Sequence, residues 1–450
     1  MAARVRTPNE ALARLMAEAG VGNDQLARRA NTAGAELGIS LHYDKTSVSH
    51  WLAGSVPKAQ ARPAITEALS RLLARPVTSA ELGWATGPAP AAEVGGGSVV
   101  SEVADLTRAD MDPSRRSLLG AGMYAAALGV PRFEDIAGRI EETSRPGRSL
   151  RIGASDVATV RTMTDRLADI LDEIGAGHAR PMAAAFLANT VTPYLDADGP
   201  AAVKQDMLAA ASDLVYLTGW MAMYEEQQGL GQRYYHQALK LAGAAEDHVT
   251  YCRTLRGMSL QASHLGYGPK AVELANAAAE AAPASGPRLV AFLRGQQAAA
   301  ASMTGDRRGA LARLRETEDA LSQADNRRDA VGGYDQAAYF FHQAHVFWHL
   351  GDRAASITAL RRSNRVRNAQ ERQGRLHALG VIADRQTQMR HVEAATETWA
   401  EFLDLHTTLS SARGDAHLRT LRLGMAEHRK VRGVSDLLAR ADDVARLKAA

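Results

Sequence analysis

Three short stretches, HLGYGPKA (264–271), MTGDRRGA (303–310) and HLGDRAAS (349–356), decide how the C-terminal half of the chain folds. Each has a glycine at its third position, and glycine is the usual residue just past the end of a helix. Each stretch also ends on a small residue, and a second small residue lies twelve positions before it. The three stretches therefore predict turns between pairs of helices.

The same twelve-residue offset between small residues occurs five times between residues 200 and 405. Two antiparallel helices can approach closely only where small side chains meet at their crossing. The pattern therefore predicts five helical hairpins over about residues 212–405, with flanking helices at 155–210 and 415–448 that complete a domain over 151–450. The five pairs are Gly219/Gly231, Ser259/Ala271, Ala298/Ala310, Ala344/Ser356 and Ala383/Ala395.

This spacing resembles a tetratricopeptide-repeat (TPR) array whose units are longer than the usual 34 residues. The resemblance implies an α-solenoid in which the first helix of each hairpin lines the concave face. Aromatic and arginine side chains on that face suit a peptide, a small molecule or a partner protein. The alternative is that most of the aromatic side chains pack between the repeats. The predicted groove residues are Tyr216, Trp220, Met223, Arg253, Arg256, Phe292, Gln296, Phe341, His345 and Trp348.

The first 80 residues have the signals of four or five short helices. Thr7 and Glu10 form a capping-box pattern, which predicts a helix that starts directly after Thr7. A second helix is expected from about Asn23. A third follows Asp44 as N-cap, and a fourth contains Ile65 and Leu69. The third helix has an apolar face to be buried and a polar face that includes Ser49 and His50.

The segments NDQLARRA (23–30) and KTSVSHWLAGSVPK (45–58) resemble the lambda-repressor-like (XRE) family of DNA-binding proteins over residues 8–75. The resemblance implies a helix-turn-helix domain at residues 1–83. The segment between the second and third helices is longer than the three or four residues usual for the motif. Residues 1–75 carry ten Lys and Arg but six Asp and Glu, a balance that favours a polyanionic partner.

Residues near the N-terminus of a recognition helix reach base edges, whereas neighbouring polar and basic residues contact phosphates. The predicted base-edge residues are Lys45, Thr46, Ser47, Ser49 and His50, and the predicted phosphate contacts are Gln25, Arg28, Lys58 and Arg62. The alternative is a small helical docking domain with solvated polar faces.

Residues 84–112 are rich in glycine and proline at their start, which predicts a flexible linker that ends in a short helix at about 99–109. Connector helices are expected at 113–150. They include SRRSLLGAGMYAAALGVP (114–131), which resembles a twin-arginine export signal. Its apolar part would span only about 20 Å as a helix, less than the ~30 Å of a hydrocarbon core. A connector helix between the two domains is the interpretation that this length favours.

Other chemistry is not indicated. The 450-residue chain has one cysteine, Cys252, which excludes a disulfide within the chain and is consistent with a cytoplasmic protein without a membrane anchor. His342, His345 and His349 share a helical face, but no carboxylate completes a zinc motif. No nucleotide-binding glycine loop or nucleophile elbow is present. We therefore expect no metal, no cofactor and no enzymatic activity.

An XRE-like head joined to a TPR-like array is similar to bacterial, actinobacterial-type XRE regulators and to the TPR-containing receptors of peptide pheromones. This resemblance implies a cytoplasmic transcription factor, a homodimer on a double-stranded DNA operator, with an effector or partner in the TPR groove. The alternative is an interaction scaffold that acts on other regulators without sequence-specific DNA binding of its own.

Overall fold

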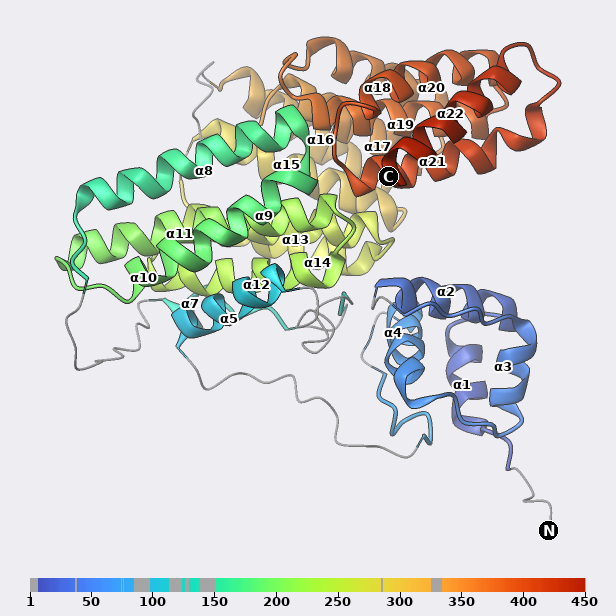
Figure 1. The fold of residues 1–450 in the computed structure, drawn as a ribbon, viewed down its shortest axis with the longest axis horizontal. Coiled ribbons are helices and arrows are strands. Elements are labelled where there is room, and N and C mark those ends of the chain that lie inside the picture. The colour runs from blue at the N-terminus through green and yellow to red at the C-terminus, as the bar shows by residue number, and fades with distance from the viewer. Residues whose placement is uncertain are drawn as a thin grey trace.

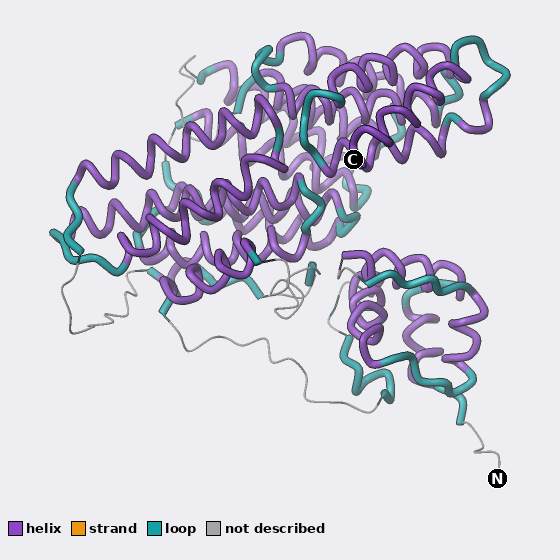
Figure 2. Tube along the Cα trace, in the orientation of Figure 1, coloured by secondary structure: helices purple, strands orange, loops and turns teal. Residues whose placement is uncertain are grey.

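The structure is a computed structural model, and its described residues form an all-α fold (Figures 1 and 2). In that part of the chain the one extended pairing is an isolated bridge between Arg151 and Asp198. No described helix has both the length and the apolar character that crossing a membrane requires. The described residues are 7–36, 39–73, 75, 77–84, 98–112, 124–125, 129–137, 150–284, 286–324 and 334–449.

In its described residues the first domain, the head, contains four α-helices and a 3-10 turn around one small core. The core includes Leu12, Leu26, Val48, Trp51 and Ile65, all at most 4% exposed, so the predicted apolar face of the third helix is indeed buried. In Figure 1 the head is a bundle separate from the longer array. Its elements are α1 (Glu10–Glu18), α2 (Asn23–Glu36), α3 (Lys45–Leu52), η1 (Ala59–Ala61) and α4 (Arg62–Leu73).

Two helix starts in the head have side-chain caps. Asp44 caps α3 as predicted, and it forms a capping box with Ser47, whose backbone N–H donates to Asp44 Oδ1 (2.8 Å). The start predicted at Thr7 is wrong, because Asn9 caps α1 by accepting from the Leu12 N–H (2.9 Å). Asn9 Nδ2 also donates to the Leu82 carbonyl (2.9 Å), so this cap ties α1 to the end of the domain.

The five predicted hairpins are present. Consecutive hairpins stack in chain order and form the array drawn from green to red in Figure 1. Each hairpin has a first and a second helix joined by a short turn, as the three quoted stretches predict. The pairs are α11 (Ala201–Tyr224) with α12 (Gln228–Ala244), α13 (His248–His264) with α14 (Gly268–Glu280), α15 (Pro287–Met303) with α16 (Arg307–Ser322), α17 (Gln336–His349) with α18 (Arg353–Val366), and α19 (Arg372–Gln388) with α20 (Val392–His406).

The small residues twelve apart lie at the helix crossings, where they are buried. A Cβ atom added to Gly219 would lie 3.0 Å from Tyr234 Cβ and 3.1 Å from the Gly231 carbonyl oxygen. In the second hairpin Ser259 Oγ donates to the Ala271 carbonyl at 2.7 Å. These distances leave no room for larger side chains, which is why the sequence pattern could locate the hairpins.

Each hairpin turn contains one residue with a left-handed backbone, seven positions after the first small residue. It is glycine in three turns, at Gly266, Gly305 and Gly351, with φ between 80° and 88°. In the first and fifth turns Glu226 (φ 56°) and Arg390 (φ 61°) take the same conformation. This conformation costs a residue with a Cβ about 1–2 kcal/mol, so these two turns are less favourable than the other three.

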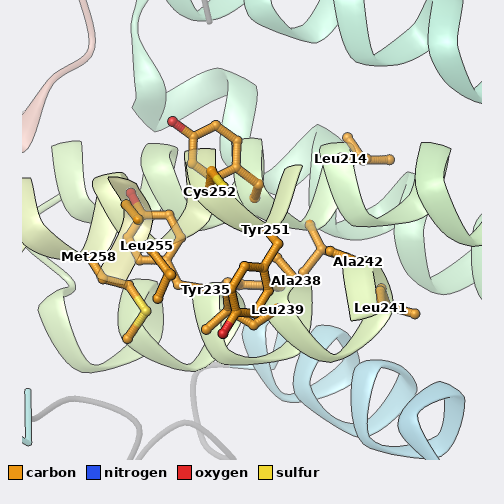
Figure 3. Close-up of a cluster of buried hydrophobic side chains, with 14 of the residues drawn as sticks. Leu214, Tyr235, Ala238, Leu239, Leu241, Ala242, Tyr251, Cys252, Leu255 and Met258 are labelled. Carbon is orange, nitrogen blue, oxygen red and sulfur yellow. The ribbon is translucent and has the colours of Figure 1, made fainter. Parts of the chain in front are cut away.

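Side chains of the second helices contribute to the packing between consecutive hairpins. Figure 3 shows one such region, in which Tyr235 and Leu239 of α12 face Tyr251 and Leu255 of α13. Tyr235 lies four positions after Gly231, the second small residue of its hairpin, and it is fully buried. The corresponding residues of the other hairpins are also at most 5% exposed: Ala275, Leu314, Leu360 and Trp399.

Flanking helices complete both ends of the array, as predicted. The N-terminal set is α8 (Ala154–Ile174), α9 (Ala176–Phe186), the π-helical turn η2 (Leu187–Val191) and α10 (Thr192–Leu195). The C-terminal set is α21 (Ala412–Gly424), η3 (Ala426–His428) and α22 (Val434–Ala449).

The short helix expected near the end of the linker is α5 (Val99–Met111), but it is not part of a free linker. Val103, Leu106 and Asp110 are buried against the array, and the Asp110 carboxylate binds Arg180 and accepts from Tyr234 Oη (2.9 Å). In Figure 1 α5 lies alongside α12. Residues 98–112 therefore belong to the array.

Most of the connector predicted at 113–150 lies outside the described residues. Within it, Tyr124 and Ala125 are described, as is a segment that includes α7 (Phe133–Ile136). The Phe133 ring stacks on His248 with ring centroids 3.8 Å apart. This part of the connector is thus packed on α13.

Candidate functional site

A cavity of about 320 Å³ opens on the face formed by the first helices of hairpins two to five. This position agrees with the prediction that first helices line the binding face. The lining residues are Leu260, Ser263 and His264 of α13, Ala299 and Met303 of α15, Phe341, His342, His345, Trp348 and His349 of α17, and His377, Val381, Asp384, Arg385 and Gln388 of α19.

Three of the ten predicted groove residues, Phe341, His345 and Trp348, line this cavity. Met223 and Gln296 are completely buried, so the prediction that they face a ligand is wrong. Both lie on the side of a first helix that contacts neighbouring helices, a distinction that repeat spacing alone does not make.

The remaining predicted groove residues lie beside the cavity rather than in its lining. Tyr216 and Phe292 are at most 8% exposed and belong to the core between helices, as the alternative interpretation of the aromatics expects. Trp220 lies half-buried near the Arg256 guanidinium, and Arg253 pairs with Asp213 (2.7 Å).

Arg385 is the main charged group of the cavity, and it is only 5% exposed. Its Nη1 donates to Ser356 Oγ (2.6 Å) and to the Ala344 carbonyl (3.3 Å), while Nη2 lies 3.3 Å from His345 Nδ1. The guanidinium carbon lies 4.7 Å from the centroid of the Trp348 ring, which is cation–π distance. Burial lowers the pKa of Arg385 to about 10, so it still carries its charge at neutral pH.

Two further buried arginines repeat this arrangement. Arg256 Nη2 lies 3.3 Å from His342 Nε2, and its guanidinium carbon is 4.5 Å from the Phe292 ring centroid. Arg413 Nη2 lies 3.2 Å from His264 Nδ1. Each arginine thus contacts one imidazole nitrogen of a histidine that lines the cavity.

Burial and the nearby guanidinium charges keep these imidazoles neutral. Burial, and next the charge of Arg385, place the pKa of His345 well below its ordinary value. The pKa values of His264, His342 and His377 are also well below that value, with burial as the largest cause. The cavity therefore presents neutral imidazoles beside a charged guanidinium at physiological pH.

The three histidines of the sequence motif contact different partners. His342 Nδ1 lies 2.9 Å from Tyr334 Oη, His345 contacts Arg385, and His349 Nδ1 lies 3.0 Å from Ser302 Oγ. Among the described residues, no group of three or more metal-binding side chains is arranged to hold an ion.

Sequence reasoning missed Arg385, although the repeat contains a signal for it. Arg385 lies two positions after the first small residue of its hairpin, Ala383. The corresponding residues in the other hairpins are uncharged and fully buried: Met221, Gln261, Ala300 and Val346. A charged residue at a position that the repeat buries is a candidate for a functional group.

The second candidate surface is the exposed side of α3. Lys45, Thr46, Ser49 and His50 are exposed, opposite the buried Val48 and Trp51. Ser49 Oγ accepts from Asn23 Nδ2 (2.9 Å), which links this surface to the start of α2. Among the five predicted base-edge residues Ser47 differs, because its hydroxyl donates to Asp44 Oδ1 (2.9 Å) and so serves the cap.

The predicted phosphate contacts surround this surface to different degrees. Gln25, Arg28 and Lys58 are exposed, and the Arg28 guanidinium pairs with the exposed Asp24 carboxylate. Arg62 is half-buried and donates from Nε to the Pro57 carbonyl (3.0 Å). Three of the four side chains are therefore exposed to solvent.

The head and the array meet at a contact between α4 and the turn that precedes α14. Arg71, paired with the buried Glu67 (2.9 Å), donates from Nη2 to the Tyr124 carbonyl (2.9 Å). Its guanidinium carbon lies 5.6 Å from the Tyr267 ring centroid, and the Tyr124 and Tyr267 rings stack at 5.6 Å. Gln232 of α12 holds the adjacent Ala125 by two hydrogen bonds, of 2.8 and 2.7 Å.

The chain shows limited similarity to known proteins. Residues 12–85 match the family described as the SP15 N-terminal domain. No curated protein sequence matches the chain. A crystal structure of a Rap protein complexed with competence and sporulation factor aligns with a TM-score of 0.39 and 13% identity, over 65% of this chain and 88% of that one. The function of the array must therefore be inferred from its own residues.

Proposed function

We propose that the chain is a DNA-binding transcriptional regulator whose helical array binds an effector or partner and thereby controls the head. The observation that carries the proposal is the polar, exposed face of α3 opposite a buried Trp51. A short helix with small polar and basic side chains near its N-terminus fits the major groove. The head would bind as one half of a homodimer on a double-stranded operator, in the cytoplasm.

The array supports the second half of the proposal with a cavity and with a physical connection to the head. The cavity lies between first helices, and α13 and α19 both contribute residues to it. The turn with Tyr267 directly follows α13 and contacts Arg71 of the head. A ligand that binds one arrangement of α13 better than another would therefore shift the head between two positions.

Selection of duplexes from a random pool with the full chain, followed by gel retardation at several salt concentrations, tests this function. With the three basic residues Arg28, Lys58 and Arg62 near phosphates, each head should give a slope of about −3 in log K against log salt. Failure to enrich any sequence would contradict direct DNA binding.

The alternative is an interaction scaffold in which the head docks on another regulator. The contact between Arg71 of the head and Tyr124 beside the array would serve such a scaffold equally well. In that case the full chain would enrich no duplex, and a partner would bind the α3 face instead. We propose no enzymatic role, since the Ser263 hydroxyl of the lining donates to the Ser259 carbonyl (2.9 Å) rather than to an imidazole, and the Asp384 carboxylate accepts from Gln388.

A further inference from the structure

Two buried guanidinium groups at the cavity form no ion pair with a carboxylate among the described residues, although the Asp384 carboxylate is near enough to Arg385 to oppose the lowering of its pKa by burial. Arg256 contacts His342 and the rings of Trp220 and Phe292. Arg385 contacts His345, Ser356, the Ala344 carbonyl and the Trp348 ring. Burying an unpaired charge is costly, so this end of the array favours a negative group that the described chain does not supply.

The arginines also fix which nitrogen of each histidine carries a proton. A guanidinium can only donate, so the nitrogen that faces it must be the acceptor of a neutral imidazole. In His345 and His264 that nitrogen is Nδ1, which places the proton on Nε2. The Nε2 atom of His345 is buried and has no hydrogen-bond partner. Each residue therefore carries on Nε2 a proton that no described acceptor takes up, and both side chains line the cavity.

Arg385 adds donors to the same cavity. Among the described residues, its five N–H groups have three acceptors, which are Ser356 Oγ, the Ala344 carbonyl and His345 Nδ1. Asp384, the one carboxylate of the lining, accepts from Gln388 Nε2 (2.9 Å) and forms no ion pair with Arg385. Unused donors thus remain, on a cationic group and on two neutral imidazoles, and together they match an anion that accepts several hydrogen bonds.

The rest of the lining determines what the anion is attached to. Leu260, Met303, Phe341, Trp348 and Val381 provide an apolar wall around the donors. A volume of about 320 Å³ lies at the lower end of the roughly 300–1,000 Å³ typical of ligand pockets. It suits one small molecule or a single terminal residue, not a longer peptide segment.

We propose that the cavity binds a small organic carboxylate with an apolar body, held at its carboxylate by Arg385, His345 and His264. This inference names the effector class of the array and so rests on the proposed function. The carboxylate has two possible sources, a free organic acid or the C-terminus of a peptide. Both present the same group to the same donors, and only the attached body differs.

Titration calorimetry with the full chain at pH 7.5 tests the proposal without DNA. The probes are benzoate, indole-3-acetate, octanoate and the tripeptide Gly-Gly-Phe, each compared with its neutral amide. We expect at least one acid to bind at least tenfold more tightly than its amide. Binding of a free acid but not of the tripeptide would assign the source to a small molecule, and the reverse would assign it to a peptide end.

Variants separate recognition from folding. Arg385→Gln should weaken the acid at least tenfold and leave the amide unchanged. Because Arg385 is buried, His345→Gln and His345→Leu provide a second test, since glutamine keeps an N–H donor and leucine does not. Ala299→Leu should block every probe by filling the cavity. Arg367→Gln is the matched control, because Arg367 is a mostly buried arginine that pairs with Glu371 (2.8 Å) and is not part of the cavity lining.

Equal affinity for the acids and their amides would overturn the proposal, and so would the absence of any acid that binds with a Kd below 1 mM. The same loss of affinity for the acid in His345→Gln and in His345→Leu would also overturn it. Displacement of a bound acid by equimolar inorganic phosphate would overturn the choice of carboxylate. The proposed function fails separately, if an acid binds but the chain retards no DNA. If DNA is retarded and no acid binds, the ligand class alone is wrong.

Discussion

Substitution of His417 by glutamine should change the stability of the array in a way that depends on pH. His417 of α21 packs against the backbone of Gly380, and its Nε2 lies 3.0 Å from His377 Nδ1. Burial, and next the positive charge of Arg413, lower the pKa of His417 to about 3. Its imidazole thus stays neutral in the folded chain at pH 5, whereas it takes up a proton on unfolding.

The size of the effect follows from this difference. In the unfolded chain an imidazole has a pKa of about 6.5, so protonation at pH 5 favours the unfolded state by about 2 kcal/mol. At pH 8 this contribution is absent. Glutamine does not titrate, so the variant lacks this pH-dependent contribution. The packing and the one hydrogen bond that the imidazole made are lost, which lowers the free energy of unfolding by about 1–2 kcal/mol at both pH values. The variant should be less stable than the wild type at pH 8 and about equally stable at pH 5.

Urea unfolding of the full chain at pH 8, 7, 6 and 5 measures this, with circular dichroism and tryptophan fluorescence as probes. His50→Gln on the exposed face of α3 is the matched control for the substitution itself. The free energy difference between variant and wild type should change by about 2 kcal/mol between pH 8 and pH 5. A difference that stays constant within about 0.5 kcal/mol would refute the assignment of His417 as a buried neutral imidazole.

Four other substitutions test separate parts of the structure. Burial, and next the charge of Glu371, raise the pKa of Asp172 to about 7, so Asp172→Asn should raise the melting temperature clearly more at pH 8 than at pH 5, because the cost of the raised pKa to the folded chain is full only above pH 7 and shrinks as the pH falls toward the ordinary value of a carboxyl group; an equal rise at both would contradict the assignment. Gly219→Val should lower the free energy of unfolding in urea by about 1–3 kcal/mol, because the added Cβ would lie 3.0 Å from the neighbouring helix. An unchanged urea midpoint would show that the helices do not pack closely at this crossing. Arg390→Gly should raise the free energy of unfolding by up to about 1 kcal/mol, because glycine adopts the left-handed conformation without strain. The substitution also removes the exposed ion pair with Glu427, and the control Glu427→Gln measures the contribution of that pair separately. Tyr267→Ala should leave the melting of the head unchanged but increase the radius of gyration in X-ray scattering, and an unchanged radius would mean that Tyr267 does not hold the head.

The hairpins were predictable because their geometry is local. A close helix crossing requires small residues on both helices, and a two-helix hairpin places them at a fixed distance along the chain, as for Gly219 and Gly231. The turns were equally local, since glycine takes the left-handed conformation at Gly266, Gly305 and Gly351. Even so, Glu226 and Arg390 show that the array enforces this conformation where the sequence gives no sign of it.

The cavity was predictable only in part, because its depth depends on contacts between distant segments. Three predicted groove residues, Phe341, His345 and Trp348, line the cavity. Whether a residue on a first helix lies in the groove or in the core depends on the rotation between successive hairpins, and Met223 lies in the core. Arg413 reaches His264 from α21, 149 positions away, which a repeat pattern does not show.

The docking of α5 was missed for a similar reason. Composition alone marked residues 84–112 as a linker, yet Val103 and Leu106 occupy one side of α5 and are buried by the array. Asp110 is the stronger signal, since a carboxylate within an apolar helical stripe needs a buried partner, which Arg180 provides.

Sequence-specific DNA binding by α3 is the central claim, and fluorescence anisotropy with a selected duplex tests it most directly. Thr46→Ala combined with His50→Ala removes two exposed side chains while Asp44 and Ser47 still cap the helix. We expect affinity for the selected duplex to fall at least tenfold, with affinity for a random duplex nearly unchanged, and the exposed Arg166→Ala on α8 to bind like the wild type. Unchanged affinity of the double variant for the selected duplex would contradict the account.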